Sequence, residues 1–161
     1  MLYDEQTINS IKDWLTEHKR TLSVAESVTA GHLQAAFSSA LEASQFFQGG
    51  ITAYNAGQKC RHLNIEPIAG LENDCVSEQV ACEMALNANK LFISHYGIAI
   101  TGYASKMPEK GLNDLFAFFA IAENNKVLLC KKITTRLERV EAQVDYAKQV
   151  IKAFETLLKN K

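Results

Sequence analysis

The feature that most constrains the fold is a short apolar run that ends abruptly in small and hydroxyl-bearing residues. Residues 22–31 read LSVAESVTAG. An apolar run of this length, followed at once by a helical pattern, predicts a strand, a tight turn and the start of a helix. The first backbone N–H groups of a helix have no partner within it, so such a turn can hold an anion or an oxyanion.

Two hydroxyl side chains in this turn are candidates for a functional role. Ser27 and Thr29 stand where their hydroxyls can meet a ligand, and the small residues Ala30 and Gly31 leave room for a ligand to approach the backbone. The alternative is that Ser27 or Thr29 only caps the following helix, a common use of a hydroxyl at a helix start. Taken alone, the stretch favours capping over a catalytic serine.

Helical and strand patterns alternate along the rest of the chain. Pro67 and Gly70 indicate a loop, and so does the polar stretch 103–114. The alternation predicts the α/β class: a three-layer α/β/α sandwich on a mixed, mostly parallel five-stranded sheet, forming a single domain over residues 1–161. Helices are expected over 4–18, from 30 to near 44, and over 55–63, 77–88 and 140–158, and strands over 22–25, 48–54, 97–101, 115–122 and 127–133.

Polar residues follow the ends of the first three predicted strands. Ser27, Tyr54 and Thr101 each stand at or just after a strand end. Ligands of such sheets bind beyond the carboxyl ends of the strands. The pattern therefore predicts a pocket at this edge of the sheet, lined by Ser27, Thr29, Tyr54 and Thr101.

Charge and composition exclude several classes of partner. The chain has 17 basic and 18 acidic residues, with a net charge of −1, and shows no basic patch for nucleic acid or for an anionic membrane. The longest apolar run, residues 115–122, is too short to span a bilayer, and the N-terminus does not resemble a signal peptide. We expect a cytoplasmic protein without a nucleic-acid or membrane partner.

The cysteines and histidines predict neither a metal site nor a redox motif. Cys60, Cys75, Cys82 and Cys130 form no C-x-x-C pair, and the four histidines show no ligand spacing. We expect free thiols, no metal and no cofactor. Apolar residues on more than one side of several helices permit a homo-oligomer without requiring it.

Four ordered stretches resemble the CinA C-terminal domain family. They are VAESVTAG (24–31), FFQGGITAYNAGQK (46–59), VSEQVACEMA (76–85) and IAITG (98–102), and the resemblance as a whole extends over nearly the whole chain. The resemblance implies an α/β/α amidohydrolase that needs no metal. It also implies a reaction that removes the amide ammonia of nicotinamide mononucleotide.

By this resemblance Ser27 is the nucleophile and Lys59 its activating base. Lysine accepts a proton only where burial or nearby cations lower its pKa, and the turn after Ser27 would supply N–H groups for the oxyanion. The alternative for Lys59 is a solvated lysine on a short helix. The candidate substrate-binding residues are Thr29, Ala30, Gly31, Tyr54, Asn55, Thr101 and Gly102.

The sequence departs from the family pattern on the side expected to hold the nucleotide. A glycine-rich loop is expected after ITG, but residues 103–108 read YASKMP, and residues 111–116 read GLNDLF where PVGTVW is expected. Arg136 and Arg139 lie in a third altered region whose register is not fixed, so neither is assigned to phosphate. A small side chain, Val28, replaces the expected cysteine.

Two hypotheses follow from the retained and the altered residues. The first is an amidase acting on nicotinamide mononucleotide or on another small amide. The second is a catalytically silent domain that binds a nucleotide-like ligand or a protein partner on the same scaffold. Because the expected phosphate cradle is lost, we expect weak or no turnover of the mononucleotide.

Overall fold

The centre of the molecule is a five-stranded sheet with the strand order β2-β1-β3-β4-β5. The computed structural model describes residues 2–161, apart from the side chain of residue 69. Two pairings of the sheet are parallel, β1 with β2 and β1 with β3, and the other two are antiparallel. The predicted α/β class and mixed sheet are confirmed. The strands are β1 (Leu22–Glu26), β2 (Phe47–Thr52), β3 (Tyr96–Gly102), β4 (Leu115–Glu123) and β5 (Lys126–Thr135).

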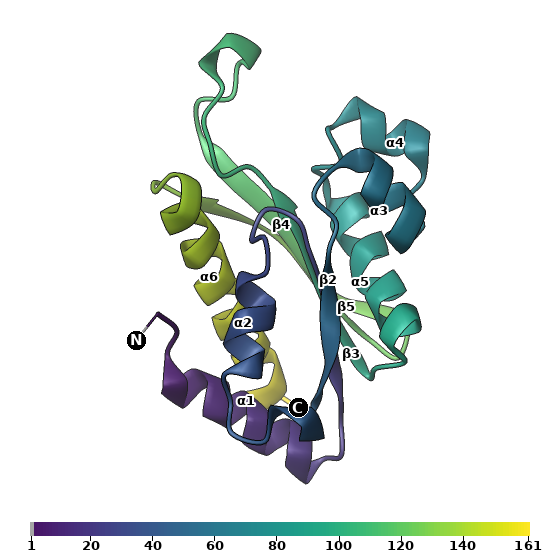
Figure 1. Cartoon of the computed structure of the whole chain (residues 1–161), viewed down its shortest axis with the longest axis vertical. Helices are drawn as coiled ribbons and strands as arrows, with labels where there is room; N and C mark the ends of the chain where they lie inside the picture. Colours follow the sequence, from purple (N-terminus) through teal and green to yellow (C-terminus); the bar gives the residue numbers. More distant parts are fainter. Residues whose placement is uncertain (1) are drawn as a thin grey trace.

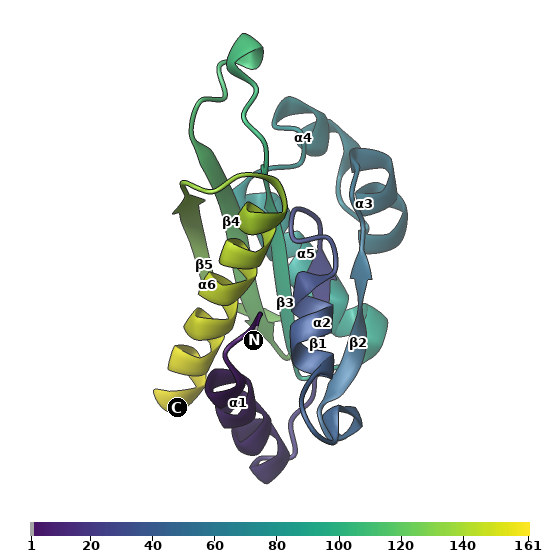
Figure 2. The ribbon, with the colours of Figure 1, turned by 60° about the vertical axis from the view of Figure 1, so that its left-hand side comes forward.

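Helices cover both faces of the sheet (Figures 1 and 2). On one face lie α1 (Glu5–Glu17), α2 (His32–Ser38) and α6 (Arg139–Lys159), and on the other lie α3 (Ala56–Leu63), α4 (Pro67–Glu72) and α5 (Glu78–Phe92). Neighbouring strand residues face different layers: Val24 packs in the core under the first group of helices and Ala25 in the core under the second. Burial on both faces explains why β1 reads as a continuous apolar run.

Two elements differ from their predicted bounds. The helix expected to reach residue 44 ends at Ser38 and is followed by the 3₁₀ turn η1 (Ala43–Gln45). The stretch expected as a loop around Pro67 and Gly70 is helix α4. Proline is compatible with the first turn of a helix because its missing N–H would have no partner there, so Pro67 starts this helix instead of preventing it.

The connection between β3 and β4 leaves the body of the molecule as a projecting arm (Figure 1). It spans residues 103–114 and contains the 3₁₀ turn η2 (Pro108–Lys110) and one bridge between Met107 and Leu112. Its base is fixed by the Tyr146 hydroxyl, which donates to the Tyr103 carbonyl (3.0 Å). Within residues 2–161, no helix has the length and apolar character needed to cross a bilayer.

Candidate active site

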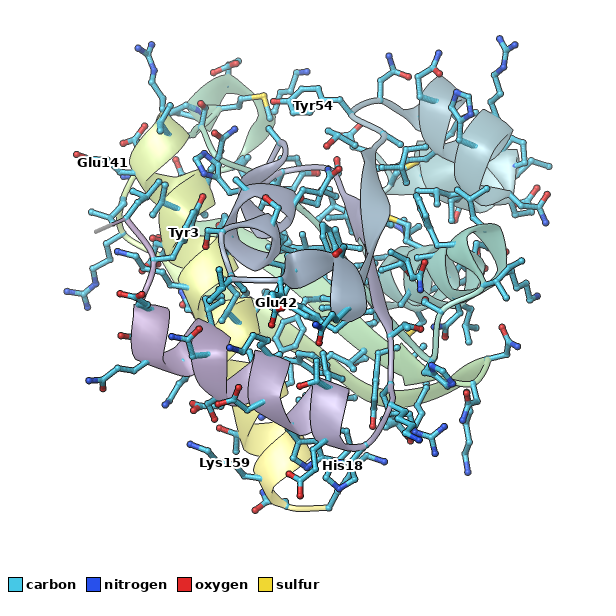
Figure 3. All side chains as sticks on the ribbon, turned by 60° about the horizontal axis from the view of Figure 1, so that its bottom comes forward. Tyr3, His18, Glu42, Tyr54, Glu141 and Lys159 are labelled. Carbon is cyan, nitrogen blue, oxygen red and sulfur yellow. The ribbon has the colours of Figure 1, made fainter. Side chains whose placement is uncertain are left out.

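A small cavity lies where the parallel strands β1, β2 and β3 end. Its volume is about 210 Å³. In Figure 3 the cavity residue Tyr54 stands at the opposite end of the molecule from His18, which precedes the start of β1. The cavity therefore occupies the carboxyl edge of the sheet. Its lining residues are Ser27, Val28, Tyr54, Lys59, Asp74, Val76, Gly102, Tyr103 and Ala104.

Ser27 is held at the cavity by the two strands that flank β1. Its backbone N–H donates to the Ile100 carbonyl of β3 (3.1 Å), and the preceding carbonyl, that of Glu26, accepts from the N–H of Ala53 beyond β2 (2.9 Å). The residue is only 4 % exposed. Its hydroxyl has no hydrogen-bond partner among the described residues, so it neither caps α2 nor supports the turn.

The carboxylate of Glu26 occupies the N-terminus of α2 and corrects one expectation. It is fully buried and accepts from the backbone N–H groups of Gly31, Leu33 and Gln34 (2.8–3.2 Å) and from the Thr29 hydroxyl (2.5 Å). A negative charge inside the chain thus satisfies donors that the sequence suggested for a ligand. The Thr29 hydroxyl is one of these donors, so it binds the Glu26 carboxylate within the chain.

Replacing Glu26 by glutamine is expected to lower the free energy of unfolding by about 3 kcal/mol, because an amide cannot accept from all four donors and places its own donor among them. The exposed Glu42, which has no side-chain cap contact, offers a matched control. Urea unfolding checks both variants. A Glu26→Gln protein as stable as Glu42→Gln would contradict this role for the carboxylate.

Two N–H groups of the turn remain without an acceptor. Ala30 and His32 donate to carbonyls within the turn, whereas Val28 and Thr29 have no backbone acceptor among the described residues. Val28 lines the cavity beside Ser27. Its N–H is therefore the candidate donor for an oxyanion formed at the serine.

Lys59 lies on α3 and is buried, in contrast to the solvated alternative. Asn55 starts this helix, its Oδ1 accepting from the Gln58 N–H (3.0 Å). Lys59 is 3 % exposed and lines the same cavity as Ser27, although no direct hydrogen bond joins the two side chains. Burial lowers the pKa of Lys59, while Cys75, Asp74 and Cys60 partly oppose that shift. The net shift is toward the neutral amine that a base requires.

The structure brings four of the predicted site residues to the cavity and leaves five outside its lining. Ser27, Lys59, Tyr54 and Gly102 line it. A side chain at Gly102 would meet Ala117 on β4 at 2.4 Å, so packing already requires glycine there. Thr29, Ala30, Gly31, Asn55 and Thr101 do not line the cavity.

Thr29 and Asn55 make the internal hydrogen bonds described above, and Gly31 and Thr101 have structural roles as well. Gly31 has a φ of 104° and nothing within 4 Å of its missing side chain, so its backbone conformation, not a close ligand, favours glycine. Thr101 is fully buried, and its hydroxyl donates to the Cys75 carbonyl (2.6 Å). This bond anchors the segment between α4 and α5 beside the cavity.

Five cavity residues were missed by the sequence analysis: Val28, Asp74, Val76, Tyr103 and Ala104. Tyr103 and Ala104 begin the altered loop, and their position directly after IAITG was the available signal. No signal in the sequence pointed to Asp74, because it lies between two helices rather than after a strand.

Larger hollows occur away from the strand ends. One of about 620 Å³ lies between the segment 2–7 and α6, and another of about 770 Å³ lies between β5 and α6. Neither is at the carboxyl edge of the parallel strands, where ligands of such sheets bind. Among residues 2–161, no group of three or more His, Cys, Asp or Glu side chains is arranged to hold a metal ion.

Comparison with known proteins gives matches along nearly the whole chain. The model of the CinA C-terminal domain matches residues 4–159. A CinA-like protein of Chlorobium chlorochromatii is 31 % identical over 94 % of this chain, and one of Picosynechococcus is 45 % identical over 58 % of it. The matched regions make up only 36 % and 22 % of those relatives. The chain thus spans about a third or less of their length.

Solved structures share the fold. The competence damage-inducible protein A of Klebsiella pneumoniae superposes with a TM-score of 0.90 at 20 % identity, covering 96 % of each chain. The competence/damage inducible protein CihA of Agrobacterium tumefaciens gives 0.86 at 21 % identity, covering 96 % of this chain and 94 % of that one. At this identity the likeness establishes the architecture alone.

Proposed function

Because the chain belongs to the CinA C-terminal domain family, we propose that it is an amidohydrolase that uses Ser27 as nucleophile and Lys59 as base. One observation carries the proposal: a buried lysine with a lowered pKa lines the same small cavity as a serine whose hydroxyl has no hydrogen-bond partner among the described residues. Lysine side chains are rarely buried without a partner, and perturbed groups in a cleft are typical of functional sites.

The reaction begins with attack of the Ser27 Oγ on the carbonyl carbon of a primary amide. The serine proton passes to the neutral amine of Lys59, directly or through one water, and the Val28 N–H stabilises the negative carbonyl oxygen. The C–N bond then breaks as Lys59 returns the proton to the leaving nitrogen, so ammonia departs and an ester remains on Ser27. Water, deprotonated by Lys59, hydrolyses the ester to the carboxylic acid and free serine.

The size of the cavity argues for a small amide rather than a whole nucleotide. Sites for drug-sized ligands measure about 300–1,000 Å³, whereas this cavity measures about 210 Å³. The segment that would replace a glycine-rich phosphate cradle continues into the projecting arm, and only Tyr103 and Ala104 from the arm reach the cavity. We therefore propose a substrate in which the amide is carried by a group no larger than an aromatic ring.

Ammonia release tests the proposal. We expect the native chain to release ammonia from at least one member of a panel of small primary amides, and from nicotinamide mononucleotide only weakly. A variant carrying a glycine-rich loop in place of residues 103–108 is expected to act better on the mononucleotide. No ammonia from any amide, with the protein folded, would contradict the proposal, and efficient native turnover of the mononucleotide would contradict the size argument.

A second candidate is a catalytically silent domain that binds a ligand in the same cavity. The observation that favours it is the missing direct hydrogen bond between Ser27 and Lys59. The amidohydrolase remains the better-supported function, because catalytic hydrogen bonds are often long before substrate binds. A silent domain would bind small amides in a titration and return them unchanged.

A further inference from the structure

Helix α5 and the edge strand β5 each carry a cysteine where they pack against one another. Cys82 lies in the second turn of α5, and Cys130 lies in β5, which pairs with β4 alone at the edge of the sheet. Both side chains are half-buried and contact the same apolar core under α5. Neither Cys82 nor Cys130 is among the residues that line the Ser27 cavity. The two thiols are therefore separate from the proposed catalytic groups.

The contacts of the Cys130 thiol place it beside Cys82. The Cys130 Sγ donates to the Glu78 carbonyl oxygen at 3.7 Å. Cys82 follows Glu78 by one helical turn, and helix side chains lean toward the N-terminus, so the Cys82 side chain extends toward the same carbonyl. The two thiols are hydrogen-bond partners. Contact between two thiols from different elements is the arrangement that a disulfide requires.

Small residues bring α5 close to the sheet, which matters because a disulfide joins Cα atoms that are about 4.4–6.8 Å apart. A Cβ on Gly97 of β3 would lie only 2.4 Å from the Ala85 carbonyl of α5, so the helix backbone contacts the strand directly. Alanines occupy further positions of this interface, including Ala81 on α5 and Ala120 on β4, the residue that pairs with Cys130. The close approach of helix and sheet allows two cysteine side chains to bridge them.

The other two cysteines are less suited to form a disulfide. Cys75 is fully buried, and α4 covers its Sγ, since a Cβ on Gly70 would lie 2.7 Å from that sulfur. Cys60 is half-buried on α3. No hydrogen bond joins the Cys60 and Cys75 thiols within residues 2–161. All four cysteines are free in this structure, and Cys82 and Cys130 are the two whose thiols meet.

We propose that Cys82 and Cys130 are a peroxide-sensitive pair that closes a reversible disulfide between α5 and the edge strand β5. The pair is independent of the proposed amidohydrolase, because neither thiol belongs to that cavity. An edge strand is held by hydrogen bonds on one side only, and the disulfide would fasten β5 to the helix that covers it. Closing the long loop between the two cysteines also restricts the unfolded chain, which stabilises the fold.

The oxidation takes two steps and consumes one molecule of hydrogen peroxide. The Cys82 thiolate attacks one peroxide oxygen, the O–O bond breaks, and the departing hydroxide takes up the proton lost by the thiol, which leaves water and a sulfenic acid on Cys82. The Cys130 sulfur then attacks the sulfenic sulfur. The S–S bond forms, the S–O bond breaks, and the hydroxyl departs as water with the Cys130 proton. Two thiols are oxidised and the peroxide is reduced to water.

The surroundings of Cys130 determine the order of these steps. Burial raises the pKa of the Cys130 thiol, and the hydrogen bond with Cys82 and the nearby Glu78 carboxylate add to this shift. Because the thiolate, not the thiol, attacks the oxidant, Cys130 stays protonated while Cys82 reacts with peroxide. Cys130 is then the resolving thiol, already in contact with the sulfur that it attacks.

Peptide mapping after mild oxidation tests the pair. The native chain is treated with hydrogen peroxide, denatured with N-ethylmaleimide to block the remaining thiols, and digested without reduction. Cleavage after lysine, arginine and glutamate separates all four cysteines, because Glu78 lies between Cys75 and Cys82. We expect the Cys82 and Cys130 peptides to be linked, with the loss of both thiol hydrogens, and dithiothreitol to separate them. The melting temperature should rise by about 4–16 °C on oxidation and return on reduction.

Serine variants separate the roles of the two thiols. Cys130→Ser should form no disulfide and should accumulate a sulfenic acid on Cys82 that dimedone traps, whereas Cys82→Ser should give neither product. Cys60→Ser, at a half-buried thiol outside the pair, is the matched control and should still form the link. If a variant fails to fold, the peptide map of the native chain decides. A native chain without the Cys82–Cys130 link, or with this link only between two copies of the chain, would overturn the inference.

Discussion

Replacing Ser27 by alanine is expected to lower kcat for amide hydrolysis by about 10³-fold or more, the range found when a catalytic nucleophile is removed. The expectation follows from the position of Ser27, which lines the cavity and whose hydroxyl has no hydrogen-bond partner within residues 2–161. Because it holds nothing else together, its removal should leave the fold intact. Ammonia release with the best amide of the panel, followed under saturating conditions, measures the effect.

Ser38→Ala is the matched control, since Ser38 is exposed on α2 and its hydroxyl donates to the Ala35 carbonyl of the same helix (3.1 Å). In urea unfolding, the free energy of unfolding of each variant should lie within about 0.5 kcal/mol of the native value. A Ser27→Ala protein that retains native activity would show that Ser27 is not the nucleophile. A loss of activity shared by Ser38→Ala would show that the assay reports stability.

Replacing Lys59 by methionine is expected to lower kcat by about 10²–10⁴-fold, the usual contribution of a general base. Methionine has a similar length and suits a buried position, so the variant removes the amine without opening a cavity. The native activity should rise with pH through an apparent pKa below the ordinary lysine value of about 10.4, because burial lowers the pKa of Lys59. The pH profile of kcat/KM for the native chain provides the measurement.

Stability supplies the control for this variant, because Lys59→Met is expected to lower activity but to raise the free energy of unfolding. In the window between the lowered pKa of Lys59 and the ordinary value, the unfolded chain holds a proton that the folded chain lacks, so native stability rises with pH there. Below that window the folded chain carries the full cost of a buried charge. Lys59→Met should therefore unfold at higher urea than the native chain at neutral pH, whereas Lys90→Met, at an exposed lysine of α5, should not. An active or destabilised Lys59→Met protein would contradict the role of Lys59.

Local patterns predicted most elements of the fold. The buried run of β1, the caps Asn55 and Ser77, and the asparagines of the β4–β5 turn each have a local physical cause, and the structure places all of them as expected. Helix α4 was missed because Pro67 was interpreted as a loop marker, although proline also starts helices. Local rules alone do not distinguish the two uses.

The candidate site was predictable only in part. Residues directly after strand ends, such as Ser27 and Tyr54, follow from the topology rule for parallel sheets. Glu26 was not recognised, because a carboxylate at the end of an apolar strand gives no sign that it will fold back onto the next helix. Asp74 reaches the cavity through a turn between two helices, a contact that depends on tertiary packing.

The most direct test of the Ser27–Lys59 site is the covalent state of Ser27 during turnover. We would mix the native chain with the p-nitrophenyl ester of a small acid, quench rapidly, and locate the acyl group by peptide mass spectrometry. The predicted result is acylation at Ser27 in the native chain, strongly reduced in Lys59→Met and absent in Ser27→Ala. Ammonia release from an amide by a chain whose Ser27 is never acylated, and whose activity survives Ser27→Ala, would contradict the account.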